Sequence, residues 1–401
     1  MELDQILDAV GIADPPQCWR EHWAESQRSF PGQGFIEPGL VDLAAGATDL
    51  DQGFVDALQR TISAIRGSDA LIRLAWLWHY SYFDKDAGEA SLWPMPSALP
   101  DEFRGMFPAV VLVTGLPRML EMHRSLGIPE QVTRDTLHDI ALWSEHYRSV
   151  HSRWGFAEFG WLQHHFLGRL FRLQRLEFMP MTYQGGYRVY RGKSDGRVIA
   201  IAESGTRFRR DGLVDGTSGI TDPDAWESTL EESNGFVRGS VISGDGHALR
   251  DRVEIRLDEW DLLLGKGTSL LDVHIPAGSG LDRQSCIDSY TMANDFYRRF
   301  FPEHKHAGFV CCSWLLDPEL GKILPADSNI VLFQREFYLL PVLSDDGQTF
   351  ERVFGGKPED LTKAPRDTSV RRAILDHVLA GNGMSKGFGF IPADEVGEPR
   401  R

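Results

Sequence analysis

Apolar side chains recur at helical spacing through the first 150 residues of the chain. Leu58, Ile62 and Ile65 lie three and four positions apart, the spacing that places side chains on one face of a helix. The same pattern returns in three further stretches: 71–78, 101–123 and 132–150. Nothing here alternates as a strand does, so residues 1–150 are predicted to form a helical N-terminal domain.

The pattern changes after residue 150. An aromatic-rich helix is expected over 156–170. Short strands are expected over 173–183, 187–191 and 197–202, and the last two should form a hairpin. Residues 203–250 are rich in Gly, Ser, Asp and Thr, and their weak periodicity predicts a long loop or insertion. Residues 151–391 are thus predicted to form a second domain, and 392–401 a disordered tail.

The stretch 270–316 has the pattern of strand, Gly-rich loop, helix and strand. An apolar run with β-branched residues ends at Pro276, and Ser279 to Asp282 has the Ser-x-x-Asp spacing of a helix N-terminal box. A helix over 283–301 and a second strand over 308–316 follow. We expect parallel strands joined by a right-handed crossover, with a helix N-terminus at the loop where anionic ligands bind.

The rest of the second domain carries few further signals. A strand is expected over 337–343, Asp345-Asp346-Gly347 predicts a hairpin turn, and 369–380 predicts a last helix. Only one β-α-β crossover is clear. The fold class is therefore predicted as α+β, with a helical N-terminal domain followed by a mixed-sheet domain.

Charge and cysteine content restrict the partners and the compartment. The formal net charge of −16 argues against a nucleic-acid backbone or an anionic membrane as partner. The four cysteines lack metal-ligand spacing, and the first ten residues lack the basic start of a targeting signal. We expect a cytoplasmic protein with reduced thiols and without a metal.

Four segments resemble a known family: Gly168–Phe178, His274–Gly278, Cys312–Pro318 and Asp327–Ile330. They are similar to the GNAT (N-acetyltransferase) fold and, more specifically, to bacterial acyltransferase-domain proteins with a helical N-terminal domain and a GNAT-like C-terminal domain. The resemblance implies acetyl-CoA or another acyl-CoA as co-substrate, held by the loop after the first central strand. The cofactor-binding positions it implies are Ile275, Ala277, Gly278, Ser279, Gly280, Leu281 and Asn329.

The loop departs from the pyrophosphate signature of GNAT enzymes, Arg/Gln-x-x-Gly-x-Gly/Ala. Ile275 stands where a polar residue is expected, and Pro276 removes one backbone N–H from the loop. Asp282, in the first turn of the predicted helix, would repel a pyrophosphate.

Acyl transfer to an amine needs a base for the amine and a proton for the departing thiolate. His274, at the end of the first central strand, is the candidate base, and Ser313 and Tyr290 are candidate proton donors. Each also has a structural interpretation, as a buried histidine, a strand serine and a core tyrosine. Glu158 and Trp314 are candidate substrate contacts, and Cys312 as a nucleophile has no partner at a recognisable spacing.

These residues lead to one hypothesis and two alternatives. The hypothesis is an acyl-CoA-dependent N-acyltransferase that acts by direct transfer on a small-molecule amine. The first alternative is a binding or scaffold protein with a GNAT fold that has lost acyl-CoA binding, and the second is transfer from aminoacyl-tRNA, which the negative charge disfavours. The acceptor, the acyl length and the oligomeric state stay open.

Overall fold

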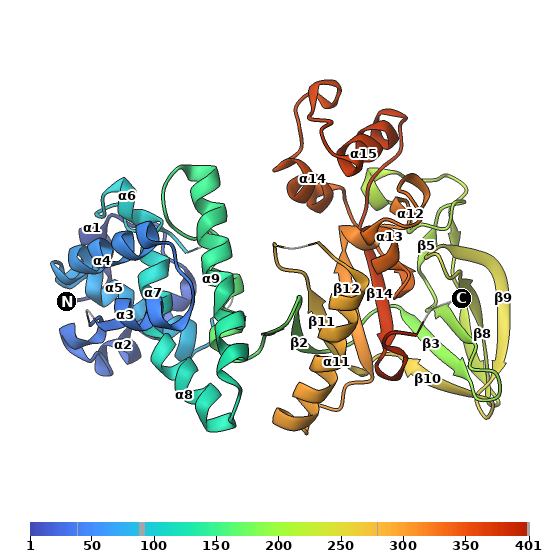
Figure 1. The fold of residues 1–401 in the computed structure, drawn as a ribbon, viewed down its shortest axis with the longest axis horizontal. Coiled ribbons are helices and arrows are strands. Elements are labelled where there is room, and N and C mark those ends of the chain that lie inside the picture. Colours follow the sequence, from blue (N-terminus) through green and yellow to red (C-terminus); the bar gives the residue numbers. More distant parts are fainter. Residues whose placement is uncertain (38, 88–92, 279, 399–401) are drawn as a thin grey trace. The chain divides into compact units, whose positions relative to one another are not determined.

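The computed structural model describes residues 1–37, 39–87, 93–278 and 280–398. They form two compact units, Met1–Leu173 and Gln174–Arg401, the first helical and the second built mainly of strands (Figure 1). The predicted α+β class, with a helical part followed by a mixed-sheet part, is confirmed.

The first unit packs its helices around α5 and α7. α7 is buried from Phe107 to Val113, so it is a core helix. The elements of the unit are α1 (Leu3–Val10), α2 (Gln17–Arg28), α3 (Gly39–Ala47), α4 (Gln52–Arg66), α5 (Asp69–His79), α6 (Asp101–Arg104), α7 (Phe107–Thr114), α8 (Leu116–Leu126), α9 (Glu130–His151), α10 (Phe159–Phe166) and the strand β1 (Phe171–Leu173). The stretch Asp101–Leu126 is long and apolar enough to cross a membrane, but 67% of its apolar window is buried within the protein.

The predicted boundary after residue 150 lies too early, because α10 belongs to the first unit. The reason is a buried carboxylate on α9. Asp139 is 2% exposed, accepts a hydrogen bond from Trp161 Nε1 at 3.3 Å, and lies 3.2 Å from His165 Nε2. Both partners stand on α10, and a buried carboxylate requires such partners.

Two sheets form the frame of the second unit. Its strands are β2 (Leu176–Thr182), β3 (Tyr187–Gly192), β4 (Val198–Ala202), β5 (Arg207–Phe208), β6 (Trp226–Glu227), β7 (Leu230–Ser233), β8 (Phe236–Ile242), β9 (Ala248–Arg256), β10 (Trp260–Leu264), β11 (Ser269–His274), β12 (Gly308–Ser313), β13 (Tyr338–Pro341) and β14 (Gly387–Pro392). One sheet has the order β2-β11-β12-β14-β13, and the other has the order β10-β3-β4-β8-β7 with β9 on β8. β3 and β4 form the predicted hairpin.

The first of these sheets has a different cover on each face. Buried side chains of both sheets, among them Val189, Leu264, Leu270 and Val310, form one hydrophobic cluster. α11 (Arg283–Phe300) lies on the opposite face (Figure 1), where the Tyr297 hydroxyl donates to the Phe178 carbonyl at 2.9 Å. β11, α11 and β12 make the predicted parallel β-α-β unit.

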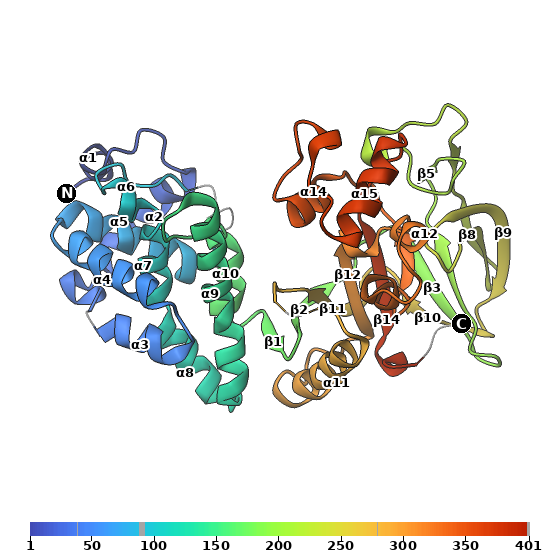
Figure 2. The same cartoon turned by 45° about the horizontal axis from the view of Figure 1, so that its top comes forward.

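Four shorter helices complete the second unit: α12 (Leu320–Ile323), α13 (Asn329–Gln334), α14 (Gly347–Phe354) and α15 (Ser369–Leu379). Figure 2 shows α14 and α15 near the end of the sheet where β12 stops. The predicted hairpin turn at Asp345-Asp346-Gly347 is wrong, because this segment leads into α14.

Two predictions about irregular segments also fail. Residues 203–250 are not one long loop but contain β5 to β8 and the start of β9. In the predicted tail, the 3₁₀ turn Ala393–Glu395 is ordered, and Asp394 and Glu395 accept hydrogen bonds from Arg191 at 2.6–2.8 Å. Residues 399–401 of the predicted tail lie outside the described residues.

Candidate functional site

β11 and β12 are paired over only part of their length. Among the residues described in the two strands, the paired positions are Leu271 with Phe309 and Asp272 with Val310. Beyond them, β11 stays paired with β2 through His274, and β12 stays paired with β14 through Ser313. Each strand keeps its outer neighbour while the two part from each other. The sheet is therefore open between the carboxyl ends of two parallel strands, and we call this gap the β11–β12 opening.

Alternation along β11 assigns its residues to two faces. Val273 faces α11, because the ring of its partner Phe178 makes an edge-to-face contact, 6.1 Å between centroids, with the ring of Tyr290 on that helix. Asp272 and His274 therefore point to the other face, where their side chains keep 26% and 28% of their exposure. Both are accessible to a ligand at the opening.

His274 and Asp272 form a pair. His274 Nε2 lies 3.2 Å from Asp272 Oδ2, two positions back on the same face of the strand. A carboxylate at this distance orients the imidazole ring. The predicted base thus has an acidic partner that the sequence interpretation had not singled out.

The loop from β11 to α11 begins at Ile275 and ends at Asp282. Asp282 is the N-cap of α11, where its carboxylate accepts from the Ser285 backbone N–H at 3.0 Å. The helix starts at Arg283, as predicted. Ser279, the start of the predicted N-terminal box, lies outside the described residues. Hydrogen bonds from Ser285 lower the pKa of Asp282, which places a negative charge at the helix N-terminus.

The other predicted cofactor positions of the loop differ in exposure. Ala277, Gly278 and Gly280 are exposed, Ile275 is half-buried and Leu281 is buried. The three exposed residues are the part of the loop that a ligand can reach. Leu281 is the position whose side chain anchors the loop.

Arg175 fixes the loop from the side of β2. Its guanidinium donates to the Pro276 carbonyl at 2.9 Å, and its backbone N–H donates to Ser289 Oγ on α11 at 3.0 Å. Its positive charge acts on the first turn of α11. Burial raises the pKa of Cys286 in that turn to about 12, and the charge of Arg175 opposes the rise. Arg175 therefore brings a positive charge to a loop that also carries Asp282.

Asn329, far along the chain, is brought to the same loop. It is the first residue of α13, and a methyl group added at Gly280 would lie 3.5 Å from Asn329 Nδ2. Two predicted cofactor-binding positions are thus neighbours in space.

Ser313 and Trp314 stand at the end of β12. Ser313 Oγ accepts from the Leu315 backbone N–H at 3.2 Å and so caps the 3₁₀ turn Trp314–Leu316. The Trp314 backbone N–H donates to Gln348 Oε1 at 2.8 Å, and its half-buried side chain packs against an apolar cluster around α12 and α15. These contacts give both residues a structural role, and their predicted roles in catalysis and substrate binding stay predictions.

Tyr290 and Glu158 lie apart from the pair of Asp272 and His274. Tyr290 is 1% exposed and packs between α11 and the sheet, on the face opposite to His274. Glu158 directly precedes α10 in the first unit. Their assignments as acid and substrate contact stay predictions as well.

Two residues of this region were missed as site candidates. The signal for Asp272 was the spacing Asp-x-His on a predicted strand, since residues two apart share a face. Arg175 has no such local signal, because it directly precedes β2 and the loop that it contacts lies about 100 positions further along the chain.

Comparisons with known proteins agree with this architecture. The family described as the GNAT-like C-terminal domain matches residues 170–391, and the N-acyltransferase N-terminal domain matches residues 43–168. No curated protein matches the chain.

Solved structures share the fold over nearly the whole chain. An acyltransferase in complex with decanoyl-CoA and teicoplanin has 19% identity and a TM-score of 0.64, covering 98% of this chain and 100% of its own. An acyltransferase in complex with CoA and 10C-teicoplanin has 19% identity, a TM-score of 0.61 and the same coverage. At this identity the likeness establishes the fold.

The family assignment rests on the match to residues 170–391, which is more than half of the chain. The open β11–β12 pair, the loop and α11 all lie inside that range. The chain belongs to the family with a GNAT-like C-terminal domain, preceded by a helical N-terminal domain.

Proposed function

We propose that this protein transfers an acyl group from acyl-CoA to the amine of a small molecule. The observation that carries the proposal is the β11–β12 opening. Two parallel strands part after Asp272 and Val310, and the gap is bordered by a helix N-terminus and an accessible His–Asp pair. A gap between two strands offers unpaired backbone groups to an extended, amide-bearing chain such as the pantetheine arm of CoA.

The chemistry follows from the side chains at this face. His274 takes a proton from the acceptor ammonium, and Asp272 stabilises the imidazolium that forms. The neutral amine attacks the thioester carbonyl carbon, a C–N bond forms, and the C–S bond of the tetrahedral intermediate then breaks. The thiolate leaves with a proton, and the amine nitrogen loses its second proton.

The loop fits the diphosphate of CoA only in part. Ala277, Gly278 and Gly280 are exposed, and Arg175 supplies a positive charge. Asp282 caps the helix with its own carboxylate and opposes an anion there. We therefore expect most of the affinity to come from the acyl-pantetheine arm.

The neighbours in fold support the acyl donor and the kind of acceptor. Two of them hold decanoyl-CoA or CoA, and one of these also holds teicoplanin. A small-molecule acceptor and a medium-length acyl-CoA are accordingly our first choices. We place the protein in the cytoplasm, in line with its buried free thiols Cys286 and Cys311.

One observation favours a second candidate, a binding protein without catalysis. Ile275 and Pro276 stand where the GNAT signature has a polar residue and a backbone donor, and Asp282 repels a diphosphate. A protein that has lost acyl-CoA binding would show these features.

A thermal-unfolding panel decides between the two. The protein is heated with CoA, acetyl-CoA, octanoyl-CoA, decanoyl-CoA and decanoyl-pantetheine. A ligand at 100 times its dissociation constant stabilises by about 2.7 kcal/mol, which raises the unfolding midpoint by roughly 5–10 °C at about 2–4 °C per kcal/mol.

A variant tests the location of the site. Cys312 is exposed on the face of His274, so Cys312→Trp should fill the opening and abolish the shift. Thr291→Trp, on the exposed side of α11, is the matched control and should keep it. Absence of a shift with every compound in the folded wild type would favour the binding protein.

A further inference from the structure

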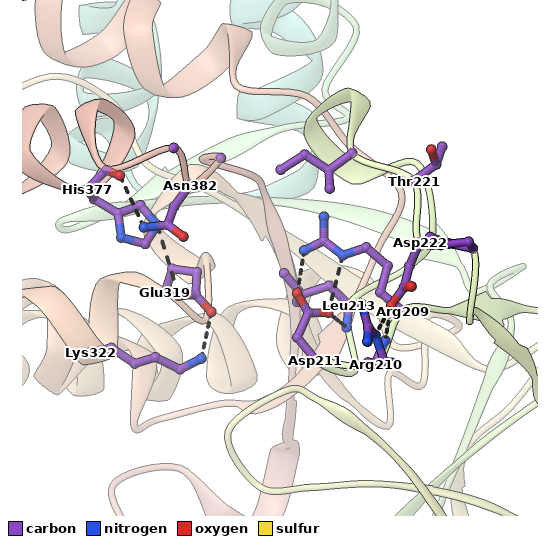
Figure 3. A pocket seen from close by; sticks show the side chains of 14 residues that line it. Arg209, Arg210, Asp211, Leu213, Thr221, Asp222, Glu319, Lys322, His377 and Asn382 are labelled. Atoms are coloured by element: carbon purple, nitrogen blue, oxygen red, sulfur yellow. Dashed lines mark hydrogen bonds and ion pairs between the residues drawn. The ribbon is translucent and has the colours of Figure 1, made fainter.

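A cavity of about 470 Å³ lies in the second unit, lined by residues that the opening does not use. Figure 3 shows two walls facing each other. One wall is the segment 209–223 after β5, and the other combines α12 with the end of α15 and the residues that follow it. The polar side chains in the lining include Arg209, Arg210, Thr221, Glu319, Lys322 and His377.

The charges in the walls are already paired. Arg209 forms a fork with Asp211, Nη2 to Oδ2 at 2.8 Å, and Arg210 Nε donates to Asp222 at 3.1 Å. Across the cavity, Lys322 donates to Glu319 Oε1 at 2.7 Å. Three cations thus meet three carboxylates, and an ionic ligand would have to break one of these pairs.

One buried polar atom in the cavity wall is left without a hydrogen bond. His377 is 8% exposed on its side chain, and its Nε2 has no hydrogen-bond partner among the described residues. Glu319 Oε2 lies 4.0 Å from this nitrogen, too far for a hydrogen bond. A buried donor left unsatisfied destabilises the fold unless a ligand or water pairs with it.

The carboxylate of Glu319, on the other side of that gap, is fixed through one of its two oxygens. Its Oε1 is engaged by Lys322 at 2.7 Å and lies 3.5 Å from His247 Nε2. The contact with His247 lowers the pKa of Glu319 to about 2, so the carboxylate is ionised and acts only as an acceptor. Its Oε2 is directed at the gap beside His377.

We propose that this cavity binds an uncharged, hydroxyl-rich group such as a saccharide ring. A hydroxyl oxygen about 2.8 Å from both His377 Nε2 and Glu319 Oε2 would accept from the first and donate to the second. It closes the 4.0 Å gap without breaking an ion pair. Leu213, Ile220 and Pro223 offer an apolar surface to the C–H groups of a ring, and the volume lies in the range of small-molecule sites, about 300–1,000 Å³.

The site is separate from the proposed acyl transfer. None of the residues that line the cavity belongs to the β11–β12 opening, so saccharide binding stands whether or not the opening binds acyl-CoA.

The test is a histidine-selective NMR titration of the full chain with ring-labelled histidine. His377→Gln identifies the His377 signal by its loss. The wild type is then titrated with D-glucose and sucrose, and separately with glycine, inorganic phosphate and ethylamine. We expect a saturable shift of the His377 signal with a saccharide and no shift with the three ionic probes.

Two variants guard against an indirect effect. Thr221→Trp places a ring from the exposed rim into the cavity and should abolish the saccharide shift, whereas Thr291→Trp should leave it unchanged. The proposal is overturned if neither saccharide moves the signal, if an ionic probe moves it instead, or if the saccharide shift survives in Thr221→Trp.

Discussion

The two faces of β11 show how one strand serves two purposes. Toward α11, Val273, Phe178 and Tyr290 are at most 2% exposed and pack as core. Toward the other face, Asp272 and His274 keep about a quarter of their exposure and lie 3.2 Å apart as a polar pair. Successive side chains of a strand point to opposite faces of the sheet, and this alternation accounts for the difference in exposure between Val273 and its two neighbours.

This contrast distinguishes two residues, His274 and Tyr290, that the sequence offered as candidates for proton transfer. His274 and Tyr290 were both predicted to handle protons, but the sheet lies between them. A group that acts on substrate must reach it within hydrogen-bond distance, or through one water. The accessible face is therefore where substitutions should change turnover, and the sealed face is where they should change stability.

The largest effect is expected from the accessible face. His274→Ala should lower turnover by about 10²–10⁴-fold, the usual contribution of a general base, with the unfolding midpoint close to wild type. Release of CoA thiol in the presence of an accepted amine measures it. His304→Ala is the matched control, since His304 contacts Ser269 and Leu270 at the other end of β11. Full turnover in His274→Ala would remove the base assignment.

The sealed face should respond through stability. Tyr290→Ala should lower the free energy of unfolding by about 3–5 kcal/mol, as deletion of a buried aromatic ring does, measured by urea unfolding. Tyr290→Phe keeps the ring and should keep turnover. A loss of turnover in Tyr290→Phe at unchanged stability would contradict the comparison and give the hydroxyl a catalytic role.

A similar contrast between sealed and accessible groups occurs at Asp317 and Glu319, two residues apart. Burial raises the pKa of Asp317 from 3.8 to about 6, despite hydrogen bonds from the backbone N–H groups of Ser385 and Glu319. Because the folded pKa is the higher one, the folded state loses stability as pH rises from about 4 to 6, by about 3 kcal/mol at about 1.4 kcal/mol per pKa unit. The pKa of Glu319 is lowered from 4.5 to about 2. Ionised Glu319 therefore stabilises the folded state above pH 4.5, and this contribution is lost as the pH falls toward 2.

Urea unfolding of the wild type and Asp317→Asn from pH 4 to 7.5 measures this prediction. The asparagine does not titrate, so the wild type should lose stability relative to the variant between pH 4 and 6. Above pH 6 the free energies of unfolding of the two proteins should change in parallel. Parallel behaviour over the whole range would show that Asp317 does not titrate there.

The smallest effect is expected where β12 leaves the sheet. Ser313→Ala removes the cap on the Leu315 N–H and should cost about 1 kcal/mol of stability, with turnover near wild type. Ser313→Thr, which keeps the hydroxyl, should restore the stability. A large fall in turnover for the alanine but not the threonine variant would instead support the predicted proton donor.

Much of the central unit could be predicted from the sequence because its signals are local. The strand at 270–275, the helix at 283–301 and the strand at 308–316 all appear within a few residues of their predicted bounds, since each is a continuous run limited by Pro or Gly. The segment 203–250 failed because most of its strands are too short to show a period. β5 and β6 have two residues each, and β7 has four, three of them polar.

Features that depend on distant partners could not be predicted. α10 joins the first unit through a carboxylate on α9, and Arg175, just before β2, contacts a loop that is distant in sequence. The cavity collects residues from three distant segments, and no spacing in the sequence connects them. His274 could be found because the end of a strand beside a Gly-rich loop is itself a local signal.

The order of strands also matters while the chain is being made. β14, the last strand, lies between β12 and β13 and is the neighbour that pairs with both. Until residues 387–392 have left the ribosome, β12 and β13 both present unpaired edges, which are templates for association with other chains. Synthesis of the first unit and most of the second therefore precedes closure of the sheet, and a chain that stops before β14 should be prone to aggregate and a natural client for chaperones.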